Sequence, residues 1–136
     1  MDNTNIPAGL PLNGISFSIK RSRVLIYRST IRELKSPEYI RFLLNKKKHT
    51  IAVQCCEQID QDSFKVPDLA NDKRVQFEIS SMNFLSIIYE IANWDPKKTY
   101  HLTGYYIEKY RLVLYDLNEA NVISDDEFVD PERSEE

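Results

Sequence analysis

The sequence lacks most features of enzymes and of membrane proteins. Its 136 residues include only three glycines, which are scattered, so no glycine-rich phosphate-binding loop is present. No Gly-x-Ser-x-Gly, paired-histidine or zinc-protease motif occurs either. No apolar run approaches the roughly 20 residues that cross a membrane, and the N-terminus lacks the charged start and apolar stretch of a signal peptide. We therefore expect a cytoplasmic, non-enzymatic protein without membrane contact.

Cysteine and histidine are also rare. The only cysteines, Cys55 and Cys56, are adjacent, and a disulfide between strand neighbours that point to opposite faces would be strained. We expect free thiols. His49 and His101 are far apart in the sequence and give no ligand spacing for zinc, so no metal or cofactor is indicated. Cys55 with either histidine could form a nucleophile and its base, but no local signature or third residue supports that pairing.

What the sequence does contain is enough apolar residues for one core and a strong asymmetry of charge. Hydrophobic residues make up 42% of the chain, which indicates one domain or two intimate halves. Residues 1–54 hold ten Lys or Arg and three Asp or Glu, whereas residues 55–136 hold eight and eighteen. The net charges are therefore +7 and −10. This division predicts a basic contact surface in the first part and an acidic segment in the second.

The acidic segment is residues 118–136, which are rich in Asp and Glu and have no sustained periodicity. We expect a disordered tail there, and an N-terminal extension at 1–14. Our hypothesis is that the tail lowers any affinity for nucleic acid because it competes for the basic surface.

An internal repeat divides the remaining chain into two halves. The stretch RVLIYRST at 23–30 is echoed by RVQFEISS at 74–81, which aligns Ser29 with Ser80. Each copy is a β-rich run that ends in a serine able to accept a hydrogen bond from the first N–H groups of a helix. A repeat of this length indicates one supersecondary unit used twice.

Each copy continues through a helix, a proline and a hairpin, and each is preceded by a further strand. Both halves are therefore expected to have the order ββαββ, with boundaries at 15–56 and 57–117. Around the repeat stretches, we expect helices at 29–35 and 80–93, and strands at 15–20, 39–44, 49–54, 63–66, 99–106 and 111–117.

The expected helix at 80–93 is apolar over most of its circumference. One face has the i, i+3, i+4, i+7 spacing of a core helix, and a second apolar face lies beside it. The first face is Phe84, Ile87, Ile88 and Ile91, and the second is Leu85, Tyr89 and Ala92. We interpret it as the core helix of the second half. The alternative is that a protein partner, or a second copy of the chain in a homodimer, covers it.

The stretch SRVLIYRSTIREL, residues 22–34, resembles the strand, turn and helix start of the AbrB-like swapped-hairpin proteins. This class of bacterial regulators includes the AbrB, antitoxin and MraZ types. In its pattern a Gly-Arg-Val-Val-Ile-Pro type stretch opens a short helix, and a loop and a hairpin follow. Arg23 to Ile26 match that pattern, whereas Ser22 replaces its glycine and Tyr27 its proline. The resemblance covers residues 15–54 directly and 63–117 through the repeat.

The resemblance implies a mainly β fold of the α+β class. In that family two ββαββ-like halves, usually from two chains, interlock their hairpins into a small barrel, and in the MraZ type both halves belong to one chain. A single half would leave open sheet edges and an uncovered apolar face. We therefore expect two swapped-hairpin-like halves to form one small barrel within this chain.

The resemblance also places DNA contacts at the turn and helix start of the first half. On the expected helix, Arg28, Arg32 and Lys35 follow i, i+4, i+7 spacing and should project together. At the corresponding positions the second half offers only Lys73 and Arg74. The candidate nucleic-acid-binding residues are Lys20, Arg21, Arg23, Arg28, Arg32, Lys35, Lys46, Lys47 and Lys48, of which the last three lie in an expected hairpin turn.

These patterns favour a DNA-binding or transcription-regulatory protein whose partner is duplex DNA. The alternative is a protein–protein interaction module of the same fold that does not bind nucleic acid. In that case the apolar second helix or the acidic tail would contact the partner.

Overall fold

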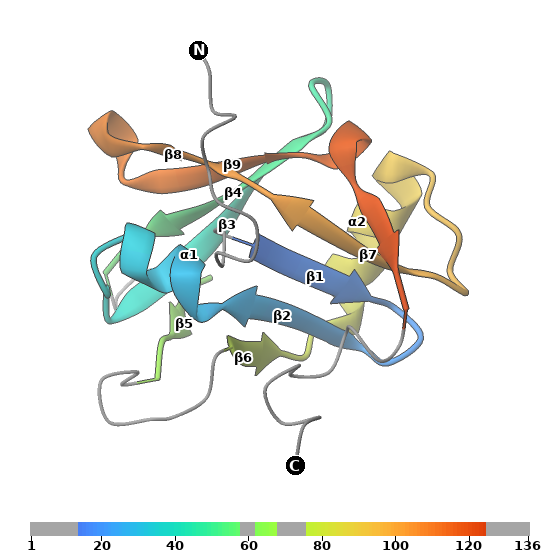
Figure 1. The fold of residues 1–136 in the computed structure, drawn as a ribbon, viewed down its shortest axis with the longest axis horizontal. Helices are drawn as coiled ribbons and strands as arrows, with labels where there is room; N and C mark the ends of the chain where they lie inside the picture. The colour runs from blue at the N-terminus through green and yellow to red at the C-terminus, as the bar shows by residue number, and fades with distance from the viewer. Residues whose placement is uncertain (1–13, 58–61, 68–75, 125–136) are drawn as a thin grey trace.

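The computed structural model describes residues 14–57, 62–67 and 76–124, and the side chains of the last range from residue 78 on. This part of the chain forms two five-stranded antiparallel sheets and two α-helices (Figure 1). Sheet A has the order β10-β7-β1-β2-β6 and contains β1 (Gly14–Ser18), β2 (Arg23–Tyr27), β6 (Gln76–Ile79), β7 (Thr99–Thr103) and β10 (Asn121–Ile123). Sheet B has the order β5-β3-β4-β9-β8 and contains β3 (Tyr39–Asn45), β4 (Thr50–Cys55), β5 (Phe64–Lys65), β8 (Tyr105–Ile107) and β9 (Leu112–Asp116). The helices are α1 (Arg28–Glu33) and α2 (Met82–Ala92), with 3-10 turns η2 (Glu108–Tyr110) and η3 (Leu117–Glu119).

The predicted mainly β fold is confirmed, because most of the described elements are strands of these two sheets. Both sheets contribute to one hydrophobic core. Ile15 and Phe17 of β1 lie in the same buried cluster as Ile51 and Val53 of β4, and none of the four has exposed surface. In each strand these apolar residues alternate, so they share one face of their sheet. The alternation of apolar side chains is therefore what makes one sheet cover the other.

The two helices begin at residues other than the expected serines. Ser81, one residue after Ser80, is the N-cap of α2, and its Oγ accepts the Phe84 N–H at 3.3 Å. Ser80 instead donates its hydroxyl to the Ser22 carbonyl at 3.1 Å. The N-cap of α1 is Tyr27, whose side chain makes no capping hydrogen bond. The repeat thus located both helices, but the capping residue differs between them.

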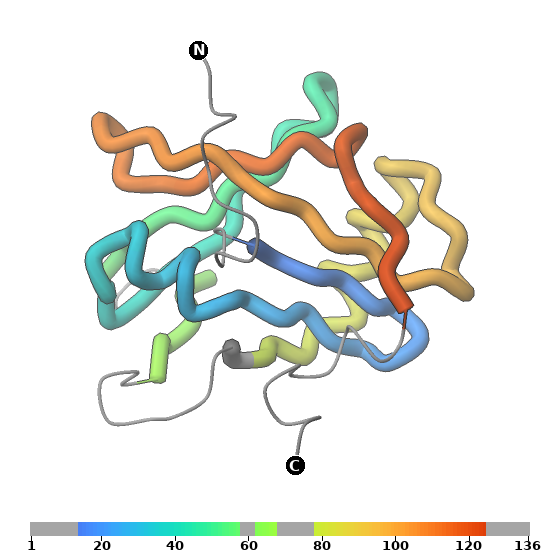
Figure 2. Tube along the Cα trace, viewed as in Figure 1, coloured from blue at the N-terminus to red at the C-terminus, as the bar shows by residue number. Residues whose placement is uncertain are grey.

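The expected closed barrel is wrong for the strands described here. The expected strand 99–106 divides at Gly104: β7 pairs with β1 in sheet A, whereas β8 pairs with β9 in sheet B. Figure 2 follows this crossing in orange. A Cβ atom at Gly104 would lie 2.5 Å from Val113 Cγ1 and 2.7 Å from the Tyr115 ring, so glycine permits the close passage over β9. The edge strands of sheet A, β10 and β6, do not pair with those of sheet B, β5 and β8, among the described residues, so the two sheets do not close on each other.

Each sheet contains strands from both expected halves, so the halves interlock rather than form separate domains. β2 of the first half pairs with β6 of the second, and β4 pairs with β9 in the same way. The first strand of each half pairs with a hairpin strand of the other half: β1 with β7, and β5 with β3. The symmetry is incomplete in the described residues, because β1 pairs with β2 whereas β5 pairs with β3 and not with β6. The superposition of two ββαββ units therefore stays a prediction.

Part of the expected acidic tail belongs to the fold. Residues 117–119 form η3, and β10 pairs antiparallel with β7, with Ile123 opposite Thr99. The folded region therefore extends past residue 118, where we expected the tail to begin. The rest of the expected tail, 125–136, and the expected N-terminal extension up to residue 13 lie outside the described residues.

Candidate nucleic-acid interface

The candidate basic residues lie in three separate places. One group is in the turn between β1 and β2 and at the start of β2, a second is on and just after α1, and the third is in the β3–β4 turn (Figure 1). These groups are Lys20, Arg21 and Arg23; Arg28, Arg32 and Lys35; and Lys46, Lys47 and Lys48. Arg23 at the start of β2 and Arg28 just after its end are five positions apart, about 16 Å at 3.3 Å per residue. The nine residues therefore do not form one continuous patch.

The expected basic face of the first helix is not formed in full. α1 ends at Glu33 with Leu34 as its C-cap, and the next residue, Lys35, has a φ of 67°. Lys35 therefore lies beyond the helix, so the prediction that it belongs to a helical i, i+4, i+7 set is wrong. Arg32 is exposed, but Arg28 is half-buried at the start of the helix. Arg32 is therefore the more exposed of the two arginines of α1.

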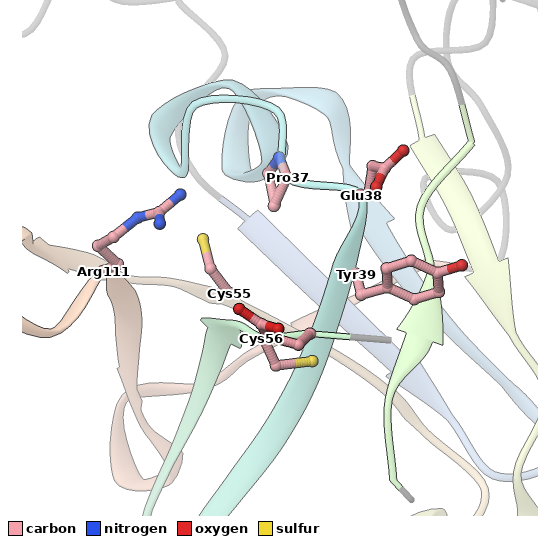
Figure 3. A pocket seen from close by; sticks show the side chains of 7 residues that line it. Pro37, Glu38, Tyr39, Cys55, Cys56 and Arg111 are labelled. Atoms are coloured by element: carbon pink, nitrogen blue, oxygen red, sulfur yellow. The ribbon is translucent and has the colours of Figure 1, made fainter. Parts of the chain in front are cut away.

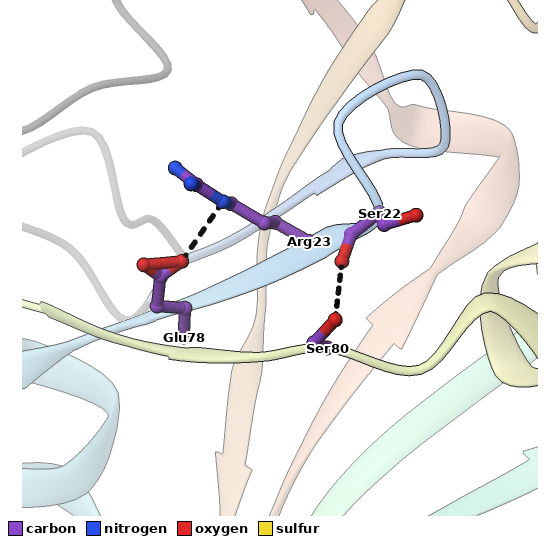
Figure 4. A network of polar contacts seen from close by, with 4 residues as sticks. All are labelled: Ser22, Arg23, Glu78 and Ser80. Carbon is purple, nitrogen blue, oxygen red and sulfur yellow. Dashed lines mark hydrogen bonds and ion pairs between the residues drawn. The ribbon is translucent and has the colours of Figure 1, made fainter.

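Arg23 is paired with an acidic side chain of the second half. Its Nε lies 3.1 Å from Glu78 Oε1, and both side chains are about half exposed (Figure 4). Glu78 is the register partner of Leu25 across β2 and β6, which places it diagonally opposite Arg23 on the same face. This exposed pair contributes little to stability, but it offsets the charge that Arg23 offers to a polyanion.

Lys97 and Lys98 lie at the same end of sheet A as Lys20 and Arg21. Lys97 and Lys98, in the turn before β7, are exposed, as are Lys20 and Arg21. The hydroxyl of Tyr89 connects the two turns, because it donates to the Lys98 carbonyl at 2.7 Å and accepts the Ile19 N–H at 3.3 Å. The backbones of the turns therefore lie within about 6 Å of each other. We call the surface formed by Lys20, Arg21, Lys97 and Lys98 the basic end.

An aromatic cluster packs against the turn that carries Lys97 and Lys98. The ring of Trp94 stacks on that of Tyr100, with centroids 4.3 Å apart, and lies edge-on to Tyr89 at 5.2 Å. The Tyr100 hydroxyl accepts the Asp95 N–H at 2.9 Å, and the Asp95 carboxylate accepts the Lys97 N–H at 2.9 Å. Asp95 is exposed and offsets one of the four positive charges. The cluster fixes the turn that carries the two lysines, so these cations are held in place relative to the β1–β2 turn.

Sequence reasoning missed Lys97 and Lys98. The second half is acidic as a whole, so its few cations gave no signal, and the relation between the two turns depends on pairing between residues far apart in the sequence. The Lys-Lys pair after Pro96, immediately before an expected strand, was the only local sign of a basic turn.

The apolar second helix is mostly a core helix. Leu85, Ile88 and Tyr89 are buried, and Phe84 stacks on Phe42 of β3 with centroids 4.6 Å apart. Among the described residues of α2, Met82 is the large apolar side chain left exposed, at 48%. Residues at the start of α2 line an open cavity of about 310 Å³, whose apolar lining residues are Phe42, Leu44, Phe64, Phe84 and Ile87. The predicted partner or homodimer contact through α2 is therefore reduced to this groove near its start.

The two cysteines line a second cavity, of about 510 Å³, together with Arg111 and Glu38 (Figure 3). Their sulfur atoms point in different directions, and neither cysteine forms a disulfide. Burial raises the pKa of the Cys55 thiol, although the charge of the Arg111 guanidinium lowers it. The Sγ of Cys55 donates to the Leu34 carbonyl at 3.5 Å. The thiol is therefore protonated at neutral pH and is not activated as a nucleophile. His101 lies in sheet A, with its Nδ1 2.8 Å from Ser16 Oγ.

Within the described ranges, no three His, Cys, Asp or Glu side chains gather as metal ligands, and no helix is long and apolar enough to span a membrane. A scan against models of protein families and searches of curated proteins and of solved structures find no match for this chain.

Proposed function

We propose that this is a cytoplasmic, non-enzymatic DNA-binding protein of the regulatory kind, and that the basic end is where it contacts the DNA backbone. One observation carries the proposal: the Tyr89 hydroxyl holds two turns from different halves so that the backbones that carry the exposed cations lie within about 6 Å of each other. The turn that carries Lys20 and Arg21 immediately precedes the stretch 22–34 that resembles AbrB-like regulators, and this resemblance implies DNA contacts at that turn.

The arrangement suits phosphates better than bases. Duplex DNA carries one negative charge per about 1.7 Å of helix axis, so a compact group of cations can neutralise several phosphates at once. Lysine side chains on turns contact phosphate oxygens and set the position of a protein on the duplex, but they carry no sequence information. Arg21 is the one side chain of the basic end with a fork suited to base edges as well. We therefore expect binding with strong salt dependence and weak sequence preference.

A fluorescence anisotropy titration with mixed-sequence duplex DNA, at several salt concentrations, tests the proposal. In the test variant, Lys20, Arg21 and Lys98 are each changed to Gln. The control variant changes Lys46, Lys47 and Lys48 to Gln, which removes the same charge from the β3–β4 turn. Each phosphate contact that is lost lowers the slope of log affinity against log salt by about 0.9. We expect a slope lower by about 2 to 3 in the test variant and nearly unchanged in the control.

Two results would refute the proposal: equal losses in the two variants, or no binding of the intact protein at low salt. The second result would favour the interaction module instead. The cavity at the start of α2, lined by Phe42, Phe64 and Phe84, is the observation that supports that second candidate, because an apolar side chain of a partner could fill it. Circular dichroism of both variants confirms that the fold is retained.

A further inference from the structure

The chain leaves sheet A beside the basic end and continues into its most acidic segment. β10 runs antiparallel to β7, so its residues advance from His101 towards Thr99, the residue that follows Lys98. Ile123 lies opposite Thr99, and only Ser124 separates it from residue 125. Residues 125–136 contain seven Asp or Glu and one Arg. The last described residue before the acidic segment is therefore one position beyond the strand partner of Thr99, which follows Lys98.

We propose that residues 125–136 dock on the basic end and compete there with DNA. Strand partners lie about 5 Å apart and each extended residue covers about 3.3 Å, so the first acidic residues, Asp125 to Glu127, reach Lys97 and Lys98 without any change in the fold. The 12 residues of the segment span up to about 40 Å, which also covers Lys20 and Arg21 on the neighbouring turn. The docking does not depend on DNA, whereas its regulatory effect rests on the function proposed above.

Tethering makes weak charge pairing effective. A short linker gives an intramolecular ligand an effective concentration of about 1 mM. If the segment alone binds the basic end with a dissociation constant of about 0.1 mM, it occupies that end in about nine molecules of ten and lowers DNA affinity about tenfold. The charges are exposed, so ions screen the interaction, and it should vanish near 1 M salt, where the screening length is about 3 Å.

Paramagnetic relaxation in the full chain tests the docking directly. A nitroxide is attached at residue 134 through Ser134→Cys, in a background with Cys55→Ser and Cys56→Ser. At low salt we expect strong broadening of the amide signals of residues 19–22 and 96–98, and recovery near 1 M salt. The amides of residues 46–48, in an equally basic turn elsewhere on the protein, are the internal control and should stay sharp.

A matched variant separates docking from the tether alone. It carries the same label, but its seven acidic residues are changed to Asn or Gln, so that only the charge differs. Broadening that this variant loses supports the docking, whereas equal broadening in both proteins, or at residues 46–48, overturns it. In the DNA titration, the unlabelled neutral variant should bind about tenfold more tightly at low salt. Docking that persists in a protein without DNA affinity would refute the proposed function but not the docking.

Discussion

Replacement of Tyr89 by Phe removes the hydroxyl that joins the two turns of the basic end and little else. The ring would still pack edge-on against Trp94 and Tyr100. The Ile19 N–H and the Lys98 carbonyl would lose their shared partner, which also lies 3.1 Å from the Phe17 carbonyl. Buried polar groups left without a partner cost about 1 to 3 kcal/mol. We expect the variant to lose about 2 kcal/mol of unfolding free energy at neutral pH, a decrease in Tm of about 6 to 10 °C for a chain of this size.

The pH dependence of this difference provides a sharper test. Burial raises the pKa of Tyr89 to about 12, from an ordinary value near 10. Between these two values the unfolded chain loses the phenolic proton while the folded chain retains it, so stability falls as pH rises from about 10 towards 12. The stability that this raised pKa contributes is present below pH 10 and is lost as the pH rises towards 12. Tyr89→Phe lacks this titration, so its deficit relative to the natural sequence should shrink over that range.

Urea unfolding at pH 8, 9.5 and 11, followed by the fluorescence of Trp94, the only tryptophan, measures both effects. Tyr110→Phe is the control, because Tyr110 is 55% exposed and its loss should change stability by less than about 0.5 kcal/mol at every pH. Tyr115, whose pKa burial also raises, is present in all three proteins and cancels in the comparison. A deficit below about 0.5 kcal/mol at pH 8, or one that stays constant up to pH 11, would show that the hydroxyl does not anchor the turns.

Two further substitutions test the fold. Gly104→Ala should lose about 2 kcal/mol or more in urea unfolding, because its methyl group would meet Val113 and the Tyr115 ring at less than 3 Å where β7 passes into β8. Ser81→Ala should lose about 1 kcal/mol of unfolding free energy with the cap on the Phe84 N–H. Ser80→Ala, its neighbour, should lose less than half of that, and the reverse order would contradict the observed cap.

The sequence predicted the local elements well, because each depends on neighbouring residues. The hairpin expected at 39–44 and 49–54 is formed by β3 (Tyr39–Asn45) and β4 (Thr50–Cys55). Apolar residues alternate through both strands, and the lysine-rich turn between them contains nothing that a core could bury. The helical spacing of Phe84, Ile87, Ile88 and Ile91 placed α2 in the same way, although the buried residues are Leu85, Ile88 and Tyr89, which come from both expected apolar faces.

The arrangement of the sheets depends on features that no local pattern contains. The division of one strand at Gly104 follows from the close approach of Val113 and Tyr115, which are about ten residues further along the chain. β10 was hidden in the acidic segment, because three residues are too few to show alternation and the residues around them are typical of a solvated tail. Pairing with β7 makes this short stretch a strand.

For the candidate site, the sequence identified cations but not their neighbours. Charge counting found Lys20 and Arg21, yet it also included Lys46–Lys48, which lie in a different turn. It also treated Arg23 as available, because Glu78 becomes its partner only when β2 and β6 pair. The basic end, which combines cations of both halves, could be identified only from the structure, because it depends on the pairing of β1 with β7.

The position of the basic end makes binding depend on the fold of both halves. Lys20 and Arg21 follow β1, whereas Lys97 and Lys98 precede β7, and these two strands are neighbours in sheet A. The pairing sets the strands side by side, and the Tyr89 hydroxyl then sets the distance between their turns. A variant such as Tyr89→Phe keeps every cation, so a purely additive charge effect would leave its DNA affinity unchanged. If DNA binding requires the spacing of the two turns, the DNA affinity of Tyr89→Phe must fall together with its free energy of unfolding.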